Sequence, residues 1–260
     1  MSDSKLVECQ THQHIATITM NRPDKGNGMS LALLSDMSAA IDTVENDDSV
    51  RVVILRSAGK NFCVGADLSD KQLAAKPADE HILQDHAPHL TGIKNSSKVY
   101  ICAVQGAAAG IGSAYAMVCD FTLMARGAYL YQAFLPIGMV PDGGATWLLG
   151  RQLGYKRAFK MMIEGTKLDA QTCLDWGLAS DVVELEDLEQ ETLKLAELIA
   201  AKAPLAVAAT KQLLHGVFSN DYENTIKAEA TKQRVMAKSA DSAEGIAAFF
   251  EKRPATFRGE

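Results

Sequence analysis

Residues 99–119 of the chain read VYICAVQGAAAGIGSAYAMVC, a stretch of 21 residues without a formal charge. Its length alone would suit a membrane helix. However, it is rich in Ala and Gly and has no Leu or Phe, and Gly106, Gly110 and Gly112 would weaken one long helix. Residues 99–104 are apolar on both alternating faces, as in a strand buried between two layers. We therefore predict a buried strand that turns through Gly110 into a helix, and no membrane span.

The segments on either side of this stretch alternate between strand and helix patterns. The β-branched run 14–20 predicts a strand, and a dense cluster of turn formers follows it at 21–28. Ser30 is a candidate N-cap for a helix that continues to about Val44 with apolar residues on one face. Residues 52–55 and 121–124 predict two further strands. Strand, helix, strand, helix in this order predicts an α/β fold.

Beyond about residue 150 the pattern becomes mostly helical. Leucines at helical spacing follow residue 188, and Pro204 predicts that this segment ends at about Ala203. Residues 205–217 and 222–238 continue in the same style. We predict a core at 1–200 and a helical region at 201–260.

The composition excludes several classes of protein. With 260 residues, 47% of them hydrophobic and 22% charged, the chain has ample material for a core, so general disorder is excluded. The 32 acidic residues outnumber the 26 basic ones, which argues against a broad nucleic-acid-binding surface. Five widely spaced cysteines without a CxxC pair predict reduced, mostly core thiols. The polar, acidic N-terminus MSDSKLVECQ lacks a secretory signal, so we expect a cytoplasmic protein.

Glycines gather at three places where strands should lead into helices, namely residues 62–68, 105–112 and 136–144. A Gly-rich turn that opens a helix presents free backbone N–H groups, and two of them converging on one point make an anion or oxyanion site. The alternative is close packing of backbone elements. Neither the GxxxxGK[ST] pattern of a P-loop nor the GxGxxG pattern of a dinucleotide site occurs, so phosphate binding of these kinds is not supported.

Taken together, these segments resemble the crotonase (enoyl-CoA hydratase/isomerase) superfamily over nearly the whole chain. Five motifs occur in the order and spacing of that family, and the ending Phe249-Phe250-Glu251-Lys252-Arg253 is similar to the family's ending. The five motifs are Asn21-Arg22-Pro23…Asn27, FCVGADL at 62–68, Gly106…Gly110-Ile111-Gly112, Cys119-Asp120 and IGMVPDGG at 137–144.

The resemblance implies a crotonase-like (ββα)n superhelix core followed by a C-terminal helical oligomerisation region, assembled as a homotrimer or a dimer of trimers. The implied substrate is an acyl-CoA thioester, with CoA entering as part of the substrate and with no other cofactor and no metal. Its carbonyl oxygen would be held by the backbone N–H groups of Ala66 and Ile111. Many relatives have Gly at the second position, so the Ile111 side chain is expected to narrow the acyl pocket.

The resemblance also carries over residues that would contact the substrate. Lys25 would reach the adenine or phosphates of CoA, and Phe249 and Lys252 match an F-x-x-K pattern that reaches CoA from a neighbouring subunit. A solvated lysine is the alternative for Lys252. The remaining substrate-binding positions are Ala66, Asp67, Leu68, Gly110 and Phe134.

The acidic residues indicate which reaction to expect. Hydratases of the family use two glutamates, and the corresponding positions here are Ala114 and Phe134. Neither side chain can take or give a proton, so the two-glutamate hydration mechanism is not available.

Asp142 is the remaining carboxylate, in the sequence Val140-Pro141-Asp142-Gly143-Gly144. Some isomerases of the family carry a single acid at this point, and the phenylacetate-pathway isomerases have a similar motif followed by Thr-Trp, as at residues 146–147 here. One carboxylate suffices to move a proton from C2 to C4 of a 3-enoyl-CoA. Apolar neighbours such as Phe134 and Ile111 would raise its pKa. The alternative role for Asp142 is an N-cap of the helix through Trp147.

The favoured function is therefore a Δ3 to Δ2 enoyl-CoA isomerase with Asp142 as the proton shuttle. Three alternatives remain open: an enoyl-CoA hydratase with a non-standard acid, an acyl-CoA hydrolase, and a non-catalytic acyl-CoA-binding homologue.

Two further groups of polar residues are interpreted as structural. Asp67 and Asp120 are expected to hold turns or cap helices. His81, His86 and His89 have a spacing that invites a metal ion, but the segment is polar and is flanked by prolines. We expect it to be a mobile surface lid with solvated histidines.

Overall fold

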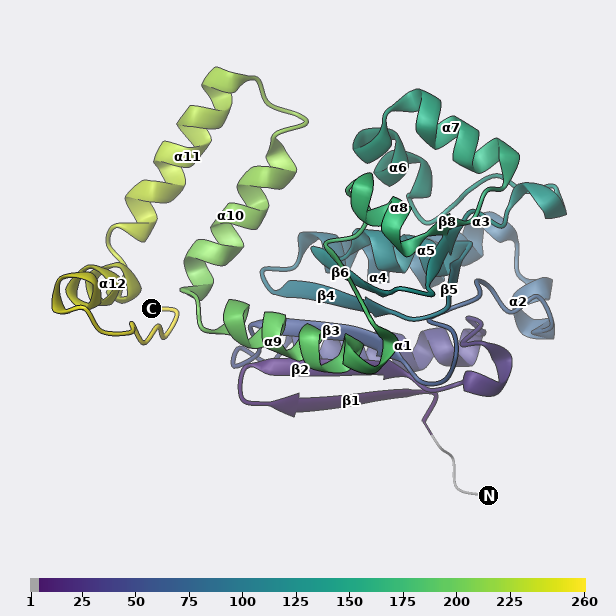
Figure 1. The fold of residues 1–260 in the computed structure, drawn as a ribbon, viewed down its shortest axis with the longest axis horizontal. Coiled ribbons are helices and arrows are strands. Elements are labelled where there is room, and N and C mark those ends of the chain that lie inside the picture. The colour runs from purple at the N-terminus through teal and green to yellow at the C-terminus, as the bar shows by residue number, and fades with distance from the viewer. Residues whose placement is uncertain (1–4) are drawn as a thin grey trace.

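A six-stranded sheet forms the centre of the computed structural model, which describes residues 5–260 (Figure 1). Its first two strands form an antiparallel hairpin, and every later strand joins in parallel. In spatial order the strands are β1 (Val7–His12), β2 (Ile15–Met20), β3 (Val52–Ser57), β4 (Val99–Val104), β6 (Phe121–Ala125) and β9 (Asp181–Val183).

Helices cover both faces of this sheet, which explains why its central strands are apolar throughout. All six residues of β4 are buried, as predicted for residues 99–104. Helix α1 (Leu31–Glu45) packs on β1 and β2, and α9 (Leu188–Ala200) packs on the opposite face against β3, β4 and β6 (Figure 1). The predicted N-cap of α1 is confirmed, because the Ser30 side chain accepts a hydrogen bond from the Leu33 N–H.

A second, three-stranded sheet consists of β5 (Ala107–Ala109), β7 (Tyr129–Tyr131) and β8 (Leu168–Asp169). Strand β5 leads through Gly110 directly into α5 (Ile111–Val118). The predicted turn from a buried strand into a helix is therefore confirmed, with the short strand β5 between them as an addition. All of α5 except Val118 is buried, so the uncharged stretch belongs to the protein core.

The remaining elements connect the two sheets or cover their ends. Three single turns of 3-10 helix span Pro23–Lys25, Leu135–Ile137 and Leu185–Asp187. A turn of π-helix, Ile82–His86, joins two of the helices. The helices are α2 (Lys71–Ala75), α3 (Ala78–His81), α4 (Ala87–Asn95), α6 (Ala145–Leu153), α7 (Tyr155–Glu164) and α8 (Ala170–Asp175).

The last three helices extend away from the sheets (Figure 1). They are α10 (Pro204–Gly216), α11 (Tyr222–Met236) and α12 (Ala240–Glu251), close to the predicted helical segments. A buried lysine on α10 attaches them to the core, because Lys211 Nζ donates hydrogen bonds to Ile93 O (3.1 Å), Lys98 O (2.9 Å) and Asp120 Oδ2 (2.8 Å). The division at residue 200 into a core and an assembly region stays a prediction.

Replacing Lys211 by methionine should lower the free energy of unfolding by about 3 kcal/mol, because Asp120 would keep its charge in a half-buried place without its cation. Chemical denaturation measures this change. Lys227→Met is the matched control, since Lys227 lies exposed on α11, and it should change stability little. Equal effects of the two substitutions would show that the buried ion pair does not hold α10 in place.

Asp120 and the cysteines agree with their predicted structural roles. Asp120 also accepts a hydrogen bond from the Tyr100 N–H at 2.8 Å. All five cysteines are free thiols, and Cys63, Cys102, Cys119 and Cys173 are buried. Across residues 5–260, no helix combines the length and the hydropathy that crossing a bilayer requires.

Candidate active site

Two parallel backbone segments meet at the start of α5. Cys63 pairs with Ala108 in an isolated parallel bridge, with Cys63 N–H donating to Ala107 O (3.0 Å) and Ala109 N–H donating to Cys63 O (2.8 Å). Ala66 and Ile111 each lie three residues beyond this pair. The register therefore carries both residues to equivalent positions on neighbouring segments.

Glycines make the close approach of these segments possible. Gly65 has φ +109° and Gly110 has φ +52°, a region of backbone conformation in which side chains are rarely tolerated. A Cβ on Gly110 would lie 3.8 Å from Gly65 Cα, so the two turns are in van der Waals contact. The residues that follow the two glycines, Ala66 and Ile111, are held side by side as a result.

The N–H groups of Ala66 and Ile111 are available to a ligand. Within the described part of the chain, neither donates a hydrogen bond to another protein group, although their neighbours Gly110 and Asp67 do. Ile111 is also the first residue of α5, where the helix dipole favours negative charge. Two free donors on neighbouring segments make this the candidate place for binding an oxyanion.

Asp142 lies in a loop that packs against the first turn of α5. A Cβ on the next residue, Gly143, would lie 2.3 Å from Ile111 Cδ1 and 2.9 Å from Ala114 Cβ. The loop thus brings Asp142 to the same end of α5 as the two free N–H groups.

The Asp142 carboxyl group lies in an apolar environment. Burial raises its pKa to about 6, as expected, and a protonated His81 nearby opposes part of this rise. Its Oδ1 atom is buried and has no hydrogen-bond partner among residues 5–260. A buried carboxylate oxygen without a protein partner is unusual, and it is typical of groups that act on a ligand.

The alternative role of Asp142 as a helix N-cap is wrong. Helix α6 begins at Ala145, and its N-cap is Gly144, in the left-handed conformation. Asp142 contributes only its backbone, whose carbonyl accepts a hydrogen bond from the Ala145 N–H. Its side chain therefore remains available for other contacts.

The two positions at which the sequence resemblance would place hydratase glutamates are apolar and buried. Ala114 is 0% exposed and Phe134 is 6% exposed. A Cβ on Gly110 would lie 3.8 Å from Phe134 Cζ, so the phenyl ring borders the turn that presents Ile111. Phe134 and Ala114 are thus both near Asp142 or the free N–H groups, and neither can transfer a proton.

The motif at residues 21–27 holds the loop that contains Ala66. Asn27 is buried and donates to Ala58 O and Asn61 O, both at 2.8 Å. Arg22 forms an ion pair with Asp67 at 2.6 Å. A hydrogen bond from the Ser69 hydroxyl, together with Arg22, lowers the pKa of Asp67 to about 2. Asp67 therefore acts as the structural turn residue that we predicted.

The other predicted substrate-binding residues lie at two separate places. Lys25 and Leu68 are exposed beside the Ala66 loop. Phe249, which is 78% exposed, lies on α12 and Lys252 is its C-cap. Helix α12 stands beyond α10, away from α2 and α5 (Figure 1). Within one chain, the structure does not bring Phe249 and Lys252 to Asp142.

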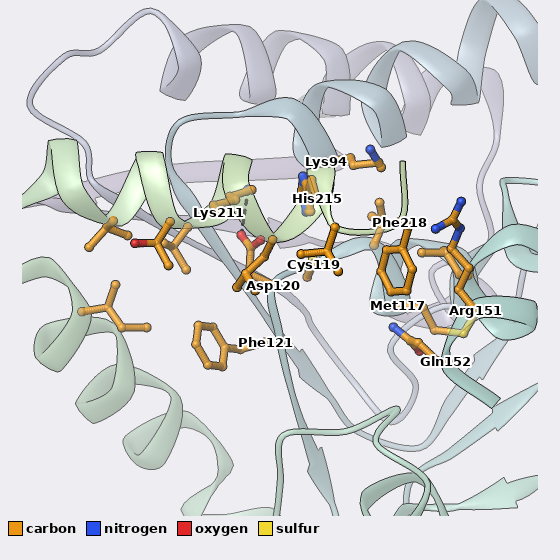
Figure 2. A pocket seen from close by; sticks show the side chains of 18 of the residues that line it. Lys94, Met117, Cys119, Asp120, Phe121, Arg151, Gln152, Lys211, His215 and Phe218 are labelled. Carbon is orange, nitrogen blue, oxygen red and sulfur yellow. Dashed lines mark hydrogen bonds and ion pairs between the residues drawn. The ribbon is translucent and has the colours of Figure 1, made fainter. Parts of the chain in front are cut away.

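Two cavities adjoin this region. An apolar pocket of about 220 Å³ lies beside Gly143, between Ile82, Leu90, Val118 and Trp147. A larger cleft of about 730 Å³ separates α10 from the core (Figure 2). Figure 2 shows Lys211 and Asp120 paired within the cleft, with Arg151 and Phe218 at its other end. Ala66, Ile111 and Asp142 lie outside the lining of the larger cleft.

The prediction of solvated histidines in a mobile lid is wrong. His86 is 1% exposed and His89 is 5% exposed, and both ring systems contact the hydroxyl group of Tyr115 on α5. Tyr115 was not predicted from the sequence, although it lies one helical turn after Ile111. Among the described residues, no three His, Cys, Asp or Glu side chains are placed to hold a metal ion.

The chain is similar to known proteins over nearly its whole length. The sequence model described as Enoyl-CoA hydratase/isomerase matches residues 10–260. The chain belongs to the enoyl-CoA hydratase/isomerase family. Its fold is the crotonase fold, with a helical region at the C-terminus.

Members of the family with different names are similar to this chain. The 1,2-epoxyphenylacetyl-CoA isomerase of Escherichia coli K12 is 32% identical over 95% of each chain. The trans-2-decenoyl-[acyl-carrier-protein] isomerase of Streptococcus mutans is 29% identical over 99% of this chain and 100% of its own. The crystal structure of an enoyl-CoA hydratase from Bacillus anthracis has a TM-score of 0.92 at 29% identity, over 98% of this chain and 100% of that one. Family membership is thus shared by hydratases and isomerases.

Proposed function

We propose that this chain is an acyl-CoA isomerase that moves a double bond from C3 to C2 of an enoyl-CoA thioester. The observation that carries the proposal is Asp142, a carboxylate with a pKa of about 6 and a buried, unpartnered oxygen, at the end of α5 where two backbone N–H groups are free. A base whose pKa lies near the working pH is well suited to general acid–base catalysis.

The N–H groups of Ala66 and Ile111 would hold the thioester carbonyl oxygen. The ionised Asp142 would remove a proton from C2, and the electrons of the broken C–H bond would shift to the thioester to form a dienolate. Both N–H groups stabilise the negative charge that develops on the oxygen. The protonated Asp142 would then return the same proton to C4, which leaves the double bond between C2 and C3. One carboxylate thus serves first as a base and then as an acid.

The surroundings of Asp142 favour isomerisation over hydration. Hydration requires a water molecule to be activated and a carbon to be protonated, and these tasks need two acid–base groups. The side chains of Ala114 and Phe134 supply neither. The apolar pocket beside Gly143 would accept the acyl group, and water would be largely excluded from C2 and C4.

The CoA part of the substrate would lie along the exposed rim of the site. Lys25 would pair with CoA phosphates there, while Asp67, Leu68, Gly110 and Phe134 would border the pantetheine and acyl segments. Phe249 and Lys252 would contact CoA from a second subunit, which a homotrimer or a dimer of trimers built by the 201–260 region would allow. The high exposure of Phe249 supports a role outside its own subunit.

The test is to incubate the protein separately with a 3-enoyl-CoA and a 2-enoyl-CoA and to follow the absorbance of the conjugated thioester. We expect the 3-enoyl-CoA to gain the conjugated chromophore without release of free thiol. Rapid loss of the chromophore from the 2-enoyl-CoA, with no action on the 3-enoyl-CoA, would establish a hydratase. Thiol release would establish a hydrolase, and binding without any turnover would establish a non-catalytic homologue.

A further inference from the structure

A continuous chain of hydrogen bonds runs from the surface of α1 to the neighbourhood of Asp142. The groups come from α1, α3, α4, α5 and the π-helical turn, and all the bonds are between side chains. In order, the pairs are Ser38 Oγ with His89 Nε2 (2.6 Å), His89 Nδ1 with Tyr115 OH (2.8 Å), Tyr115 OH with His86 Nδ1 (3.3 Å), His86 Nε2 with His81 Nε2 (3.0 Å), and His81 Nδ1 with Asp85 Oδ2 (2.8 Å).

The local backbone explains how these side chains meet. A π-helical turn bonds residues five apart, and the turn Ile82–His86 places His81 and His86, which are five apart, with ring centroids at 4.5 Å. Such turns occur often at functional sites. Tyr115 is 0% exposed and lies one helical turn after Ile111, so its hydroxyl group joins the two buried histidines beneath the candidate active site.

Each hydrogen bond of this series can be given one donor and one acceptor when His81 is neutral. The Asp85 carboxylate accepts two bonds from Lys76 Nζ, at 2.9 and 2.8 Å, and so it is ionised and can only accept from His81 Nδ1–H. His81 Nε2 must then accept from His86 Nε2–H, and His86 Nδ1 accepts from the Tyr115 hydroxyl. Every remaining donor points in the same direction, from Ser38 toward Asp85.

The donors and acceptors are equally consistent when His81 is protonated, with every bond beyond it reversed. A proton that enters from water at the Ser38 hydroxyl displaces the hydroxyl proton onto His89 Nε2. His89 passes its Nδ1 proton to Tyr115, Tyr115 passes its own to His86 Nδ1, and His86 passes its Nε2 proton to His81. One proton enters at Ser38 and one proton arrives at His81. His89, Tyr115 and His86 are each neutral before and after the transfer.

Burial keeps the intermediate histidines uncharged, so that the chain can relay protons without storing charge. Desolvation, together with the nearby His81 and His89, lowers the pKa of His86 to about 3, although Asp85 opposes this effect. Desolvation also lowers the pKa of His89, although Asp42 on α1 and Asp85 oppose this effect. Ser38 is half-buried on α1, and it can exchange protons with water at the outer end.

The inner end of the hydrogen-bond chain, His81, lies near the loop that carries Asp142. Ile82, which follows His81, lines the same apolar pocket as Gly143, which follows Asp142. His81 is the charged group that acts on the Asp142 carboxyl group, and its positive charge lowers the pKa that burial raises. His81 also pairs with Asp85, which forms a close ion pair with Lys76 at 2.8 Å, and Asp79 and Glu80 precede His81 on α3.

We propose that the hydrogen-bond chain through His86, Tyr115 and His89 exchanges the proton of His81 with solvent at Ser38. His81 adjoins the pocket that Gly143 also lines, and there it is a positioning residue for Asp142. The role of Asp142 in this proposal rests on the proposed function. A bound acyl-CoA would cover the rim of the site, and the chain offers a proton route that does not cross the rim.

The first test measures the Asp142 carboxyl group directly, by carbon-13 NMR of protein labelled at Asp, with Asp142→Asn to assign the signal. Wild type should titrate near pH 6. His81→Gln removes the positive charge, so the carboxyl group should titrate higher, by about one pH unit, which is a tenfold change in proton affinity. His12→Gln on the exposed part of β1 is the matched control and should leave the titration unchanged. An unchanged titration in His81→Gln would overturn the coupling.

The second test follows the ring tautomers of the three histidines by nitrogen-15 NMR as the pH is lowered from 8 to 5. In wild type, His86 and His89 should both exchange the protonated nitrogen as His81 gains its proton. Tyr115→Phe removes the hydroxyl group between them, so His89 should no longer follow His81. Tyr100→Phe is the matched control, because Tyr100 is equally buried but donates to Glu45 outside the chain. Tautomers that stay fixed in wild type would overturn the relay.

These measurements separate the two proposals, because neither requires turnover. If no enoyl-CoA reacts but both NMR tests succeed, then the proposed function fails and the coupling stands. If a 3-enoyl-CoA is isomerised and His81→Gln leaves the titration of Asp142 unchanged, then the function stands and the proposed role of His81 is wrong.

Discussion

Asp142→Asn should lower kcat/KM for a 3-enoyl-CoA by about 10²–10⁴, the range that general acid–base groups contribute. An amide cannot take the C2 proton, and no second carboxylate replaces it, since Ala114 and Phe134 occupy the neighbouring positions. The affinity for a non-reacting acyl-CoA should change little, because the two N–H donors remain. Steady-state kinetics together with calorimetric titration of the acyl-CoA separate these two effects.

Asp169→Asn is the matched control for this substitution. Asp169 caps α8, and asparagine caps a helix equally well, so activity and stability should both be retained. Asp142→Asn should also unfold at no lower temperature than wild type at pH 8, because burial disfavours the ionised form of Asp142 in the folded state. Turnover of every enoyl-CoA at the wild-type rate would rule out Asp142 as the proton shuttle.

Gly112→Ala should lower kcat/KM by about 10²–10³, as does the loss of one oxyanion donor. A Cβ at this position would lie 2.6 Å from Cys63 O and 2.7 Å from Cys63 Cβ, so the backbone of α5 must move away from the segment that carries Ala66. The two N–H groups would no longer converge. Strain of this kind should also cost about 1–3 kcal/mol of stability, which chemical denaturation would measure.

Gly150→Ala is the matched control, because Gly150 lies in α6 and a Cβ there would meet no atom within 4 Å in the described structure. It should keep full activity, and its free energy of unfolding should rise by roughly 0.5–1 kcal/mol because alanine has a better helix propensity. Wild-type activity in Gly112→Ala would mean that the separation of the Ala66 and Ile111 donors does not limit the reaction.

The main strands and α1 were predictable from the sequence because each depends on a local pattern. Residues 99–104 are apolar on both faces, and Ser30 precedes a helical stripe, so both predictions were confirmed. Strand β1 was missed because its hairpin turns at Gln13, which adopts φ +52° without the glycine that usually marks such a turn. Strands β5, β7 and β8 have two or three residues each and exist only through their pairing partners.

The apolar setting of Asp142 was also predictable, since a single acid stood among apolar residues in a recognisable motif. The burial of His86 and His89 was not, because it depends on Tyr115, which comes from a different helix about 30 positions later in the chain. Polar residues between prolines are typical of a surface loop. Only the tertiary contact with α5 shows that both histidines hydrogen-bond to the Tyr115 hydroxyl group inside the core.

The parallel bridge between Cys63 and Ala108 has a consequence for how such an enzyme can diversify. Because the proposed oxyanion donors belong to the main chain, the side chains at positions 66 and 111 are not needed for charge stabilisation. These side chains can change to suit acyl groups of other shapes, while the bridge keeps the two backbone N–H donors in place. Under the proposed function, the side chain of Ile111 can then shape the acyl site without any change in the chemistry of the two N–H donors.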